Sequence, residues 1–371
     1  MSFSSQPPPG EEFIRFLRHP EQLLVASPET QDLMVRIARG QGLLARLGDE
    51  FRQRKLLDTC PPRLARQFEG AFAIAQVHAR MLRWEVNRIQ RATRGCPGPL
   101  VLLKGAAYLL GGYDWARERL VSDVDILVDK DNLSCIEEGL KDHGWEVVKL
   151  DEYDQRYYRD WMHEIPPLRH SQRATEVDVH HNILPPTGRR KPDPQRLLQD
   201  ATPISGEDPR LSTLCPSDMV LHNIAHLFQD GDFRSGLRQL LDLDGMLTTF
   251  SSTDGFWEDL QYRAQAMDLV RPLYYGLLMA GKLLRTPIPP KIIEDLNRIG
   301  GPNPVLRVIM EQLMASVLIP THPDQSNRVA ALAGWLLYLR SHWLRMPPLM
   351  LARHLWIKSR RKGPGKSHAT V

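Results

Sequence analysis

The hydrophobic pattern of the N-terminal part of the chain has the period of α-helices. Between residues 11 and 94, apolar side chains recur every three or four positions in groups around Phe13, Leu33 and Leu43. The longest of these segments, residues 61–94, opens with two prolines and is followed by Gly95, which suits a helix start and a helix end. We therefore predict an N-terminal helical region at residues 11–95. Residues 1–10 are rich in Ser and Pro and are predicted to be disordered.

Short apolar runs, typical of strands, replace this pattern between residues 96 and 190. Strands are predicted just before residue 105 and at 123–128, 145–149 and 175–181, with helices at 106–110 and 132–143. A further run at 163–170 is interrupted by two prolines, so it is expected at a sheet edge. A loop at 185–194 carries three adjacent basic residues. This loop is expected either to mark a domain boundary or to overhang the functional site and attract phosphate.

The helical period returns after residue 190. Helices are predicted from residue 216 and at 237–247, 256–284 and 305–318. The expected organisation is a core of short strands and helices at 96–190, a C-terminal helical bundle at 191–320 and a basic amphipathic tail at 321–371. The predicted fold class is α+β and mostly helical, with a small mixed β-sheet flanked by helical regions.

Charge distribution and cysteine content indicate where the chain is basic and in which compartment it is expected. The net charge is +4, but nine of the 48 basic residues and none of the 44 acidic ones follow Asp324, so the preceding chain has 39 − 44 = −5. Cys60, Cys96, Cys135 and Cys215 match no zinc spacing and are interpreted as reduced thiols of a cytoplasmic protein. The chain shows neither a secretory signal nor a transmembrane run.

Two carboxylates open one of the predicted strands. Asp123 and Asp125 are two residues apart, so both project from one face of a strand. Neighbouring carboxylates repel each other, and Mg²⁺ relieves the repulsion because it prefers oxygen ligands. On a second strand Glu176, Asp178 and His180 also share a face. If the two strands are neighbours, Asp178 completes a three-carboxylate cluster that can hold two metal ions for displacement at phosphorus.

These motifs resemble the DNA polymerase β-like nucleotidyltransferase superfamily, and within it a bacterial branch of uncharacterised nucleotidyltransferases. The resemblance spans roughly residues 95–260 and rests on Lys104-Gly105, Arg119, Asp123-Val-Asp125, Asp178-Val-His180, Leu221-His-Asn-Ile-Ala-His226 and Leu240-Leu-Asp-Leu243. It implies that Asp123 and Asp125 ligate Mg²⁺ and that Asp178 is the third ligand or the base. It also implies an NTP, such as ATP, as substrate.

One pair of residues departs from the superfamily pattern. The chain has Gly105-Ala106 where Gly-Ser or Gly-Gly is usual. Phosphate contacts would then depend on backbone N–H groups at the helix start together with Lys104 and Arg119, and the expected nucleotide-binding set also includes His180. Arg119 has an alternative role, a salt bridge to a carboxylate of the cluster.

Other functions receive less support from the sequence. No G-x-x-x-x-G-K-[ST] motif occurs, which disfavours a P-loop NTPase. His222 and His226 have zinc-ligand spacing, but Asn223 stands where a metalloprotease has Glu, so helix packing is the expected role. A nucleotide-sugar glycosyltransferase also uses Asp-x-Asp, although normally after a strand. A degenerate nucleotide-binding or scaffold protein is the non-enzymatic alternative.

The predicted reaction is transfer of an NMP from an NTP to an unidentified acceptor, with release of pyrophosphate. A small molecule, a glycan and a peptide all remain open as acceptor. The C-terminal tail mixes Trp335, Trp343 and Trp356 with arginines. Such a segment lies on an anionic membrane, binds a partner protein or docks onto the body of its own chain.

Overall fold

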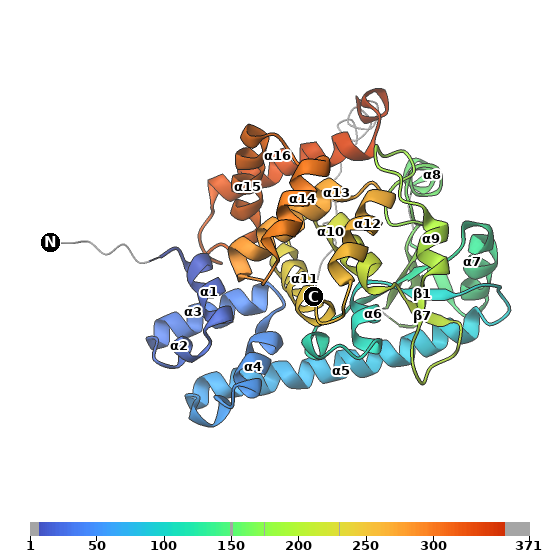
Figure 1. Ribbon diagram of the computed structural model, residues 1–371. Helices are drawn as coiled ribbons and strands as arrows, with labels where there is room; N and C mark the ends of the chain where they lie inside the picture. The colour runs from blue at the N-terminus through green and yellow to red at the C-terminus, as the bar shows by residue number, and fades with distance from the viewer. Residues whose placement is uncertain (1–6, 149–150, 174, 230, 353–371) are drawn as a thin grey trace.

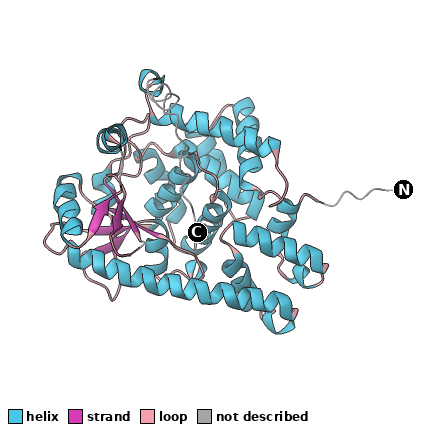
Figure 2. Ribbon diagram, turned by 180° about the vertical axis from the view of Figure 1, so that it is seen from behind, coloured by secondary structure: helices cyan, strands magenta, loops and turns pink. Residues whose placement is uncertain are grey.

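The computed structural model describes residues 7–148, 151–173, 175–229 and 231–352. Helices make up most of it, and one seven-stranded mixed sheet lies toward one side of the molecule (Figure 2). The predicted α+β class, mostly helical with helical regions flanking a small mixed sheet, is confirmed.

The N-terminal helices precede the sheet in the chain. They are α1 (Pro9–Arg18), α2 (Glu21–Leu24), α3 (Pro28–Gly40), α4 (Leu44–Gln53) and α5 (Pro62–Ala92), with a 3₁₀ turn, η1 (Leu57–Thr59). Helix α1 starts at Pro9 and buries Phe13 and Phe16, so the prediction of disorder for residues 1–10 is wrong at its C-terminal end. Residues 1–6 lie outside the described part. The long helix α5 forms where its prolines and apolar spacing predict it, and it runs beneath the sheet (Figure 1).

The sheet has the strand order β3-β4-β5-β2-β1-β7-β6. Its strands are β1 (Leu100–Leu102), β2 (Asp123–Leu127), β3 (Trp145–Val147), β4 (Leu168–His170), β5 (Glu176–His180), β6 (Thr202–Pro203) and β7 (Leu211–Thr213). Strand β2 is central, parallel to β5 and antiparallel to β1, and β1 is parallel to β7. Strands β6 and β7 continue the sheet beyond residue 190, the expected end of the core.

Short helices connect the strands. They are α6 (Lys104–Leu110), α7 (Leu133–Asp142), α8 (Glu152–Trp161) and α9 (Pro194–Gln199), with the 3₁₀ turns η2 (Asp114–Ala116) and η3 (Lys130–Asn132). Helix α7 approaches the end of α5 so closely that a Cβ on Gly139 would lie 2.5 Å from the carbonyl oxygen of Ala92.

This packing corrects the interpretation of the cysteines. Cys96 and Cys135 are joined by a disulfide, with 5.7 Å between their Cα atoms. The two cysteines are 39 residues apart, so the sequence did not indicate that they are close in space. They meet because α7 packs against α5. Cys60 and Cys215 are free thiols. The expectation of reduced thiols is therefore wrong for the disulfide pair, and it no longer supports the expected cytoplasmic location.

The C-terminal helices pack around α10. They are α10 (Pro216–Gln229), α11 (Gly236–Phe250), α12 (Phe256–Ala266), α13 (Val270–Met279), α14 (Pro290–Gly300), α15 (Pro304–Leu318) and α16 (Arg328–Arg345), with a π-helical turn, η4 (Ala280–Leu284). Helix α10 is buried almost completely because α11, α12, α13 and α16 all contact it. Within it, Asp218 has no exposed surface, and its carboxylate accepts two hydrogen bonds from Arg263, of 2.8 and 2.6 Å.

Across the described residues, none of the helices combines the length and the apolar character needed to cross a bilayer.

Candidate active site

The three aspartates singled out in the sequence come from two neighbouring strands. Strands β2 and β5 run parallel, and their register pairs Asp125 with Asp178 and Asp123 with Glu176. Paired positions of neighbouring strands project from the same face of a sheet, and so do residues two apart on one strand. Asp123, Asp125 and Asp178 therefore share one face, together with His180.

Asp125 is the most strongly held of these carboxylates. It is 3% exposed, and its Oδ1 accepts a hydrogen bond of 2.7 Å from Lys104 Nζ. His180 Nε2 lies 3.0 Å from the same oxygen. Burial alone would raise the pKa of Asp125, but the charge of Lys104 and the hydrogen bond to His180 hold this pKa well below its usual range. Asp125 is therefore an anion at neutral pH.

Lys104 reaches Asp125 from an uncommon backbone conformation. Its φ of 47° lies in the left-handed region, which costs a non-glycine residue about 1–3 kcal/mol. The residue occupies the turn where β1 ends and α6 begins. Burial lowers the pKa of its ammonium group, but the neighbouring Asp125 outweighs this effect and the pKa is raised. Lys104 therefore stays positively charged.

Asp178 has a different environment from Asp125. Its Oδ1 is buried and accepts no hydrogen bond from any described residue. Burial, followed by repulsion from Asp125 and Glu164, raises the pKa of this carboxyl to about 8. A buried acceptor without a donor is unfavourable, and a cation close to Asp125 and Asp178 would remove both the repulsion and the missing contact.

Arg119 is fixed by a residue that the sequence analysis did not consider as its partner. Its Nε donates a hydrogen bond of 2.9 Å to Oδ2 of Asp242 on α11. The salt bridge foreseen as an alternative therefore exists, but it is not made with one of the three aspartates. A Cβ on Gly105 would lie only 2.1 Å from Arg119 Nη1. Glycine is needed at position 105 because the guanidinium group of Arg119 occupies that space.

A pocket of about 150 Å³ opens beside Asp123 and Asp125. Its wall combines acidic, basic and neutral polar groups from β2, α6, α10, α11 and the loop before β2. The lining residues are Lys104, Gly105, Tyr108, Arg119, Leu120, Ser122, Asp123, Asp125, Asn223, His226, Ser235, Arg238 and Gln239. Three of the predicted nucleotide-binding residues, Lys104, Gly105 and Arg119, are thus on this wall.

Arg238 is a charged pocket residue that sequence reasoning missed. Burial, followed by repulsion from Arg119, lowers the pKa of its guanidinium group. Its Nε is buried and has no hydrogen-bond partner among the described residues. No local motif marks Arg238 as a site residue. The one available signal is its helical spacing of four from Asp242, which places both side chains on the same face of α11.

Several predicted residues lie outside the pocket wall. Ala106 is 1% exposed and packs in the core, while His180 is buried behind Asp125. His222 is also buried, and burial together with nearby Lys104 lowers its pKa well below the usual value. No residue of the basic loop at 185–194 lines the pocket, and Arg189 N donates to the carbonyl oxygen of Leu344 on α16.

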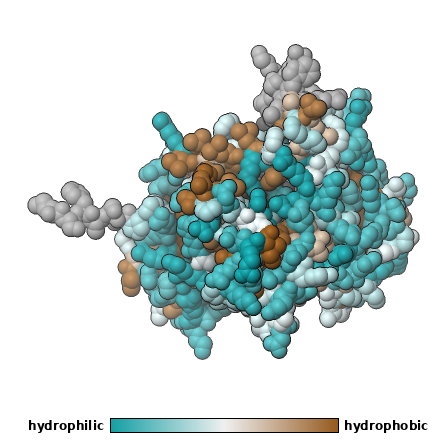
Figure 3. Space-filling model, turned by 45° about the horizontal axis from the view of Figure 1, so that its top comes forward, coloured by the Kyte–Doolittle hydropathy of each residue, from teal (hydrophilic) through white to brown (hydrophobic). Residues whose placement is uncertain are grey.

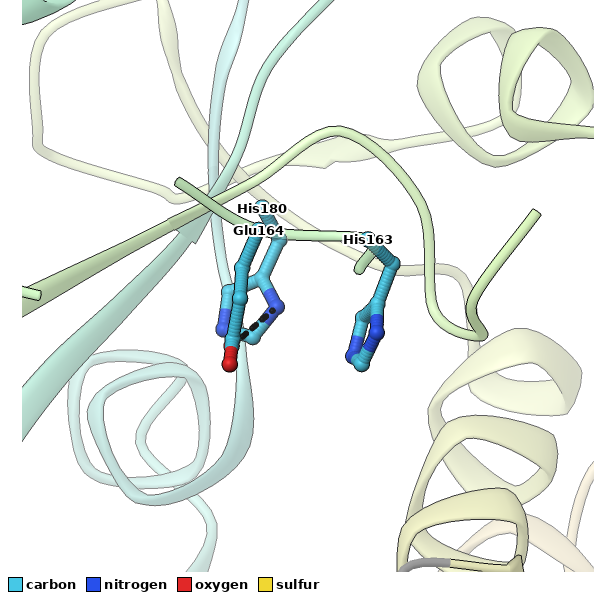
Figure 4. Close-up of side chains that lie close together, drawn as sticks. All are labelled: His163, Glu164 and His180. Carbon is cyan, nitrogen blue, oxygen red and sulfur yellow. Dashed lines mark ion pairs between the residues drawn. The ribbon is translucent and has the colours of Figure 1, made fainter. Parts of the chain in front are cut away.

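A second cluster lies on the other side of Asp125. Ligand atoms of His163, Glu164 and His180 lie within 4.8 Å of one another, and all three side chains point the same way in Figure 4. His180 Nδ1 lies 3.4 Å from Glu164 Oε2, and His180 Nε2 contacts Asp125. His180 thus links Glu164 to Asp125. Burial lowers the pKa of His180, but its two carboxylate neighbours reverse this, so the pKa is raised.

The aspartate cluster fits a hard divalent cation. Carboxylate oxygens are preferred ligands of Mg²⁺. Within the described chain both donors to Asp125 contact Oδ1, so its Oδ2 remains available, and Oδ1 of Asp178 has no donor. Asp123 and Asp125 both line the pocket, whereas Asp178 lies outside its wall. Asp125 and Asp178 therefore offer carboxylate oxygens of the kind that Mg²⁺ prefers, whereas the ligand atoms within 4.8 Å of one another belong to His163, Glu164 and His180.

The comparisons with known proteins identify a family for this chain. A family model described as uncharacterised nucleotidyltransferase matches residues 27–285, which is more than half of the chain. The comparisons with curated proteins and with solved structures give no match. The matched segment contains the helices α3 to α13, all seven strands and every residue of the pocket wall. The chain therefore belongs to the family of uncharacterised nucleotidyltransferases.

Proposed function

We propose that this protein transfers a nucleotidyl group from a nucleoside triphosphate to an acceptor, with Mg²⁺ held by Asp123, Asp125 and Asp178. The register of β2 and β5 carries the proposal, because it sets Asp125 directly beside Asp178 on one face of the sheet. Family membership supports the same general reaction.

The charge and the size of the pocket suit the triphosphate end of a nucleotide. Lys104, Arg119 and Arg238 contribute three cationic side chains to one wall. The volume of about 150 Å³ is smaller than that of a typical site for a whole drug-sized ligand, about 300–1,000 Å³. Phosphate groups therefore occupy the pocket, and the nucleoside lies toward its mouth.

The aspartates have separate parts in the proposed reaction. Bound Mg²⁺ would stabilise the charge on the reacting phosphate and orient it for in-line attack. Lys104 and His180 hold Asp125 in place. Asp178 completes the cation site or accepts the proton of the attacking group, since its carboxyl has the higher proton affinity of the strand pair.

The test compares two aspartates of the same strand region. Asp123→Asn removes a charge from the pocket wall, whereas Asp129→Asn removes one at the other end of β2, outside the pocket. Asparagine retains the capping oxygen at position 129. Calorimetry with each of the four ribonucleoside triphosphates, with and without Mg²⁺, should show Mg²⁺-dependent binding by the native protein. Asp123→Asn should weaken it at least about tenfold, and Asp129→Asn should not change it.

Absence of NTP binding by the native protein, or equal binding by Asp123→Asn, would overturn the proposal. Turnover is tested separately with an α-³²P-labelled NTP and fractions of a cell extract as the source of acceptor. Label should move to a new product with the native protein and not with Asp123→Asn. Mg²⁺-dependent binding without transfer to any fraction would favour the non-catalytic alternative.

A further inference from the structure

Apolar side chains gather on the outside of the last two described helices. Seven large apolar or aromatic residues of α16 are between 37% and 68% exposed: Val329, Leu332, Trp335, Leu336, Tyr338, Leu339 and Trp343. Helix α15 packs on α16 and adds Val305, Val308 and Ile309. Figure 3 shows apolar surface, in brown, gathered on the upper part of the molecule, where Figure 1 places both helices. Monomeric proteins rarely leave a contiguous patch of this kind without a binding role.

Six of these residues of α16, all except Tyr338, form one stripe. At 3.6 residues per turn they fall within a sector of about 120°, and they extend along about 21 Å of helix. Ala333, Leu337 and Ser341 are buried and fall in a different sector, which faces the body of the protein. The stripe is therefore not needed to attach α16 to its own chain.

Basic groups lie at the two ends of the stripe. Arg328 is exposed at the start of α16, and no acidic residue follows Asp324 in the sequence. At the other end, the basic loop at 185–194 docks against α16, and the guanidinium carbon of Arg189 lies 4.5 Å from the ring centroid of Trp343. Lys191 of the same loop is exposed. Exposed cations therefore lie at both ends of the stripe, whereas the chain up to Asp324 carries a net charge of −5.

We propose that α16 and its basic surroundings bind the surface of an anionic lipid bilayer, with the stripe lying in the interface. Tryptophan favours the boundary between headgroups and acyl chains, and Trp335 and Trp343 both belong to the stripe. The charge asymmetry turns this face, rather than the acidic body, toward anionic lipid. The proposal does not depend on nucleotidyl transfer.

The test uses the full chain and vesicles of phosphatidylcholine, with or without phosphatidylglycerol, in a co-sedimentation assay. The native protein should bind the anionic vesicles, and added salt should weaken the binding. Trp335→Glu places an anion in the centre of the stripe and should reduce binding more than about tenfold, while Arg328→Ala should reduce it about fivefold. The control is Tyr262→Glu, which changes a side chain that is 62% exposed on α12.

Each outcome decides the proposal. The proposal is supported if Trp335→Glu loses binding to anionic vesicles, Tyr262→Glu binds them like the native protein, and both variants unfold at the native temperature. Equal binding to neutral and anionic vesicles would overturn it, and so would native binding by Trp335→Glu, because lipid would then be bound elsewhere on the chain. If vesicles are not bound, and sedimentation velocity shows a dimer that Trp335→Glu dissociates, a second copy covers the stripe and the proposal fails.

Discussion

Replacing Gly105 by alanine sets two physical effects against each other. In an unobstructed helix, alanine in place of glycine stabilises the fold by about 1 kcal/mol. At position 105, however, the new Cβ would lie 2.1 Å from Arg119 Nη1 and 2.6 Å from Val121 Cγ2. Both distances are well below van der Waals contact, so Arg119 must move. The sign of the stability change shows which effect is larger.

The cost follows from the partner of Arg119. Arg119 donates to Asp242, whose side chain is 1% exposed, and leaving such a carboxylate without its partner costs about 3–5 kcal/mol. Arg46 Nη1 lies 3.5 Å from the other oxygen of Asp242, so the charge of this carboxylate remains partly balanced when Arg119 moves. After the helix-propensity gain is subtracted, we expect Gly105→Ala to lower the free energy of unfolding by about 2 kcal/mol.

Urea unfolding followed by circular dichroism measures this difference. The matched control is Gly70→Ala within α5, where an added Cβ would meet no atom within 4 Å. This control should be about 1 kcal/mol more stable than the native protein. If Gly105→Ala is as stable as the native protein or more stable, position 105 has room for a side chain. The argument that Arg119 requires glycine there would then be refuted.

Three further predictions concern stability. Glu137 accepts a hydrogen bond from Arg159, which holds the pKa of the glutamate at about 2. Because this pKa is lowered in the folded state, ionised Glu137 stabilises the fold above about pH 4.5, and this stabilisation is lost as the pH falls toward 2. Glu137→Gln should therefore lower the melting temperature at pH 6 and lower it much less at pH 2.5, and a deficit independent of pH would contradict this. Cys135→Ser removes the disulfide, which joins cysteines 39 residues apart, and should lower the free energy of unfolding by up to about 4 kcal/mol. Urea unfolding under oxidising conditions measures this difference, and reductant should not destabilise the variant further. Asp218→Asn leaves Arg263 without its buried counter-ion and should cost about 3 kcal/mol, whereas a change within 0.5 kcal/mol would show that the pair contributes little.

The sequence alone determined the elements that depend on local pattern. Alternation of apolar residues with Asp123 and Asp125 located β2, and the same alternation around Asp178 located β5, because the side-chain period of a strand can be read from neighbouring residues. Prolines and apolar spacing located α5. The prediction that the three aspartates form one site rests on the assumption that β2 and β5 are neighbours, and the strand register shows that these two strands are paired.

The tertiary structure alone decided the contacts between distant segments. Arg119 and Asp242 are 123 residues apart, and Glu164 meets His180 from a segment that the sequence assigned only to a sheet edge. Arg238 enters the pocket because α11 packs against α10, and no motif records this. Such contacts follow from how helices and strands pack in three dimensions. A local pattern predicts which face of an element is buried, but it does not specify the element that covers that face.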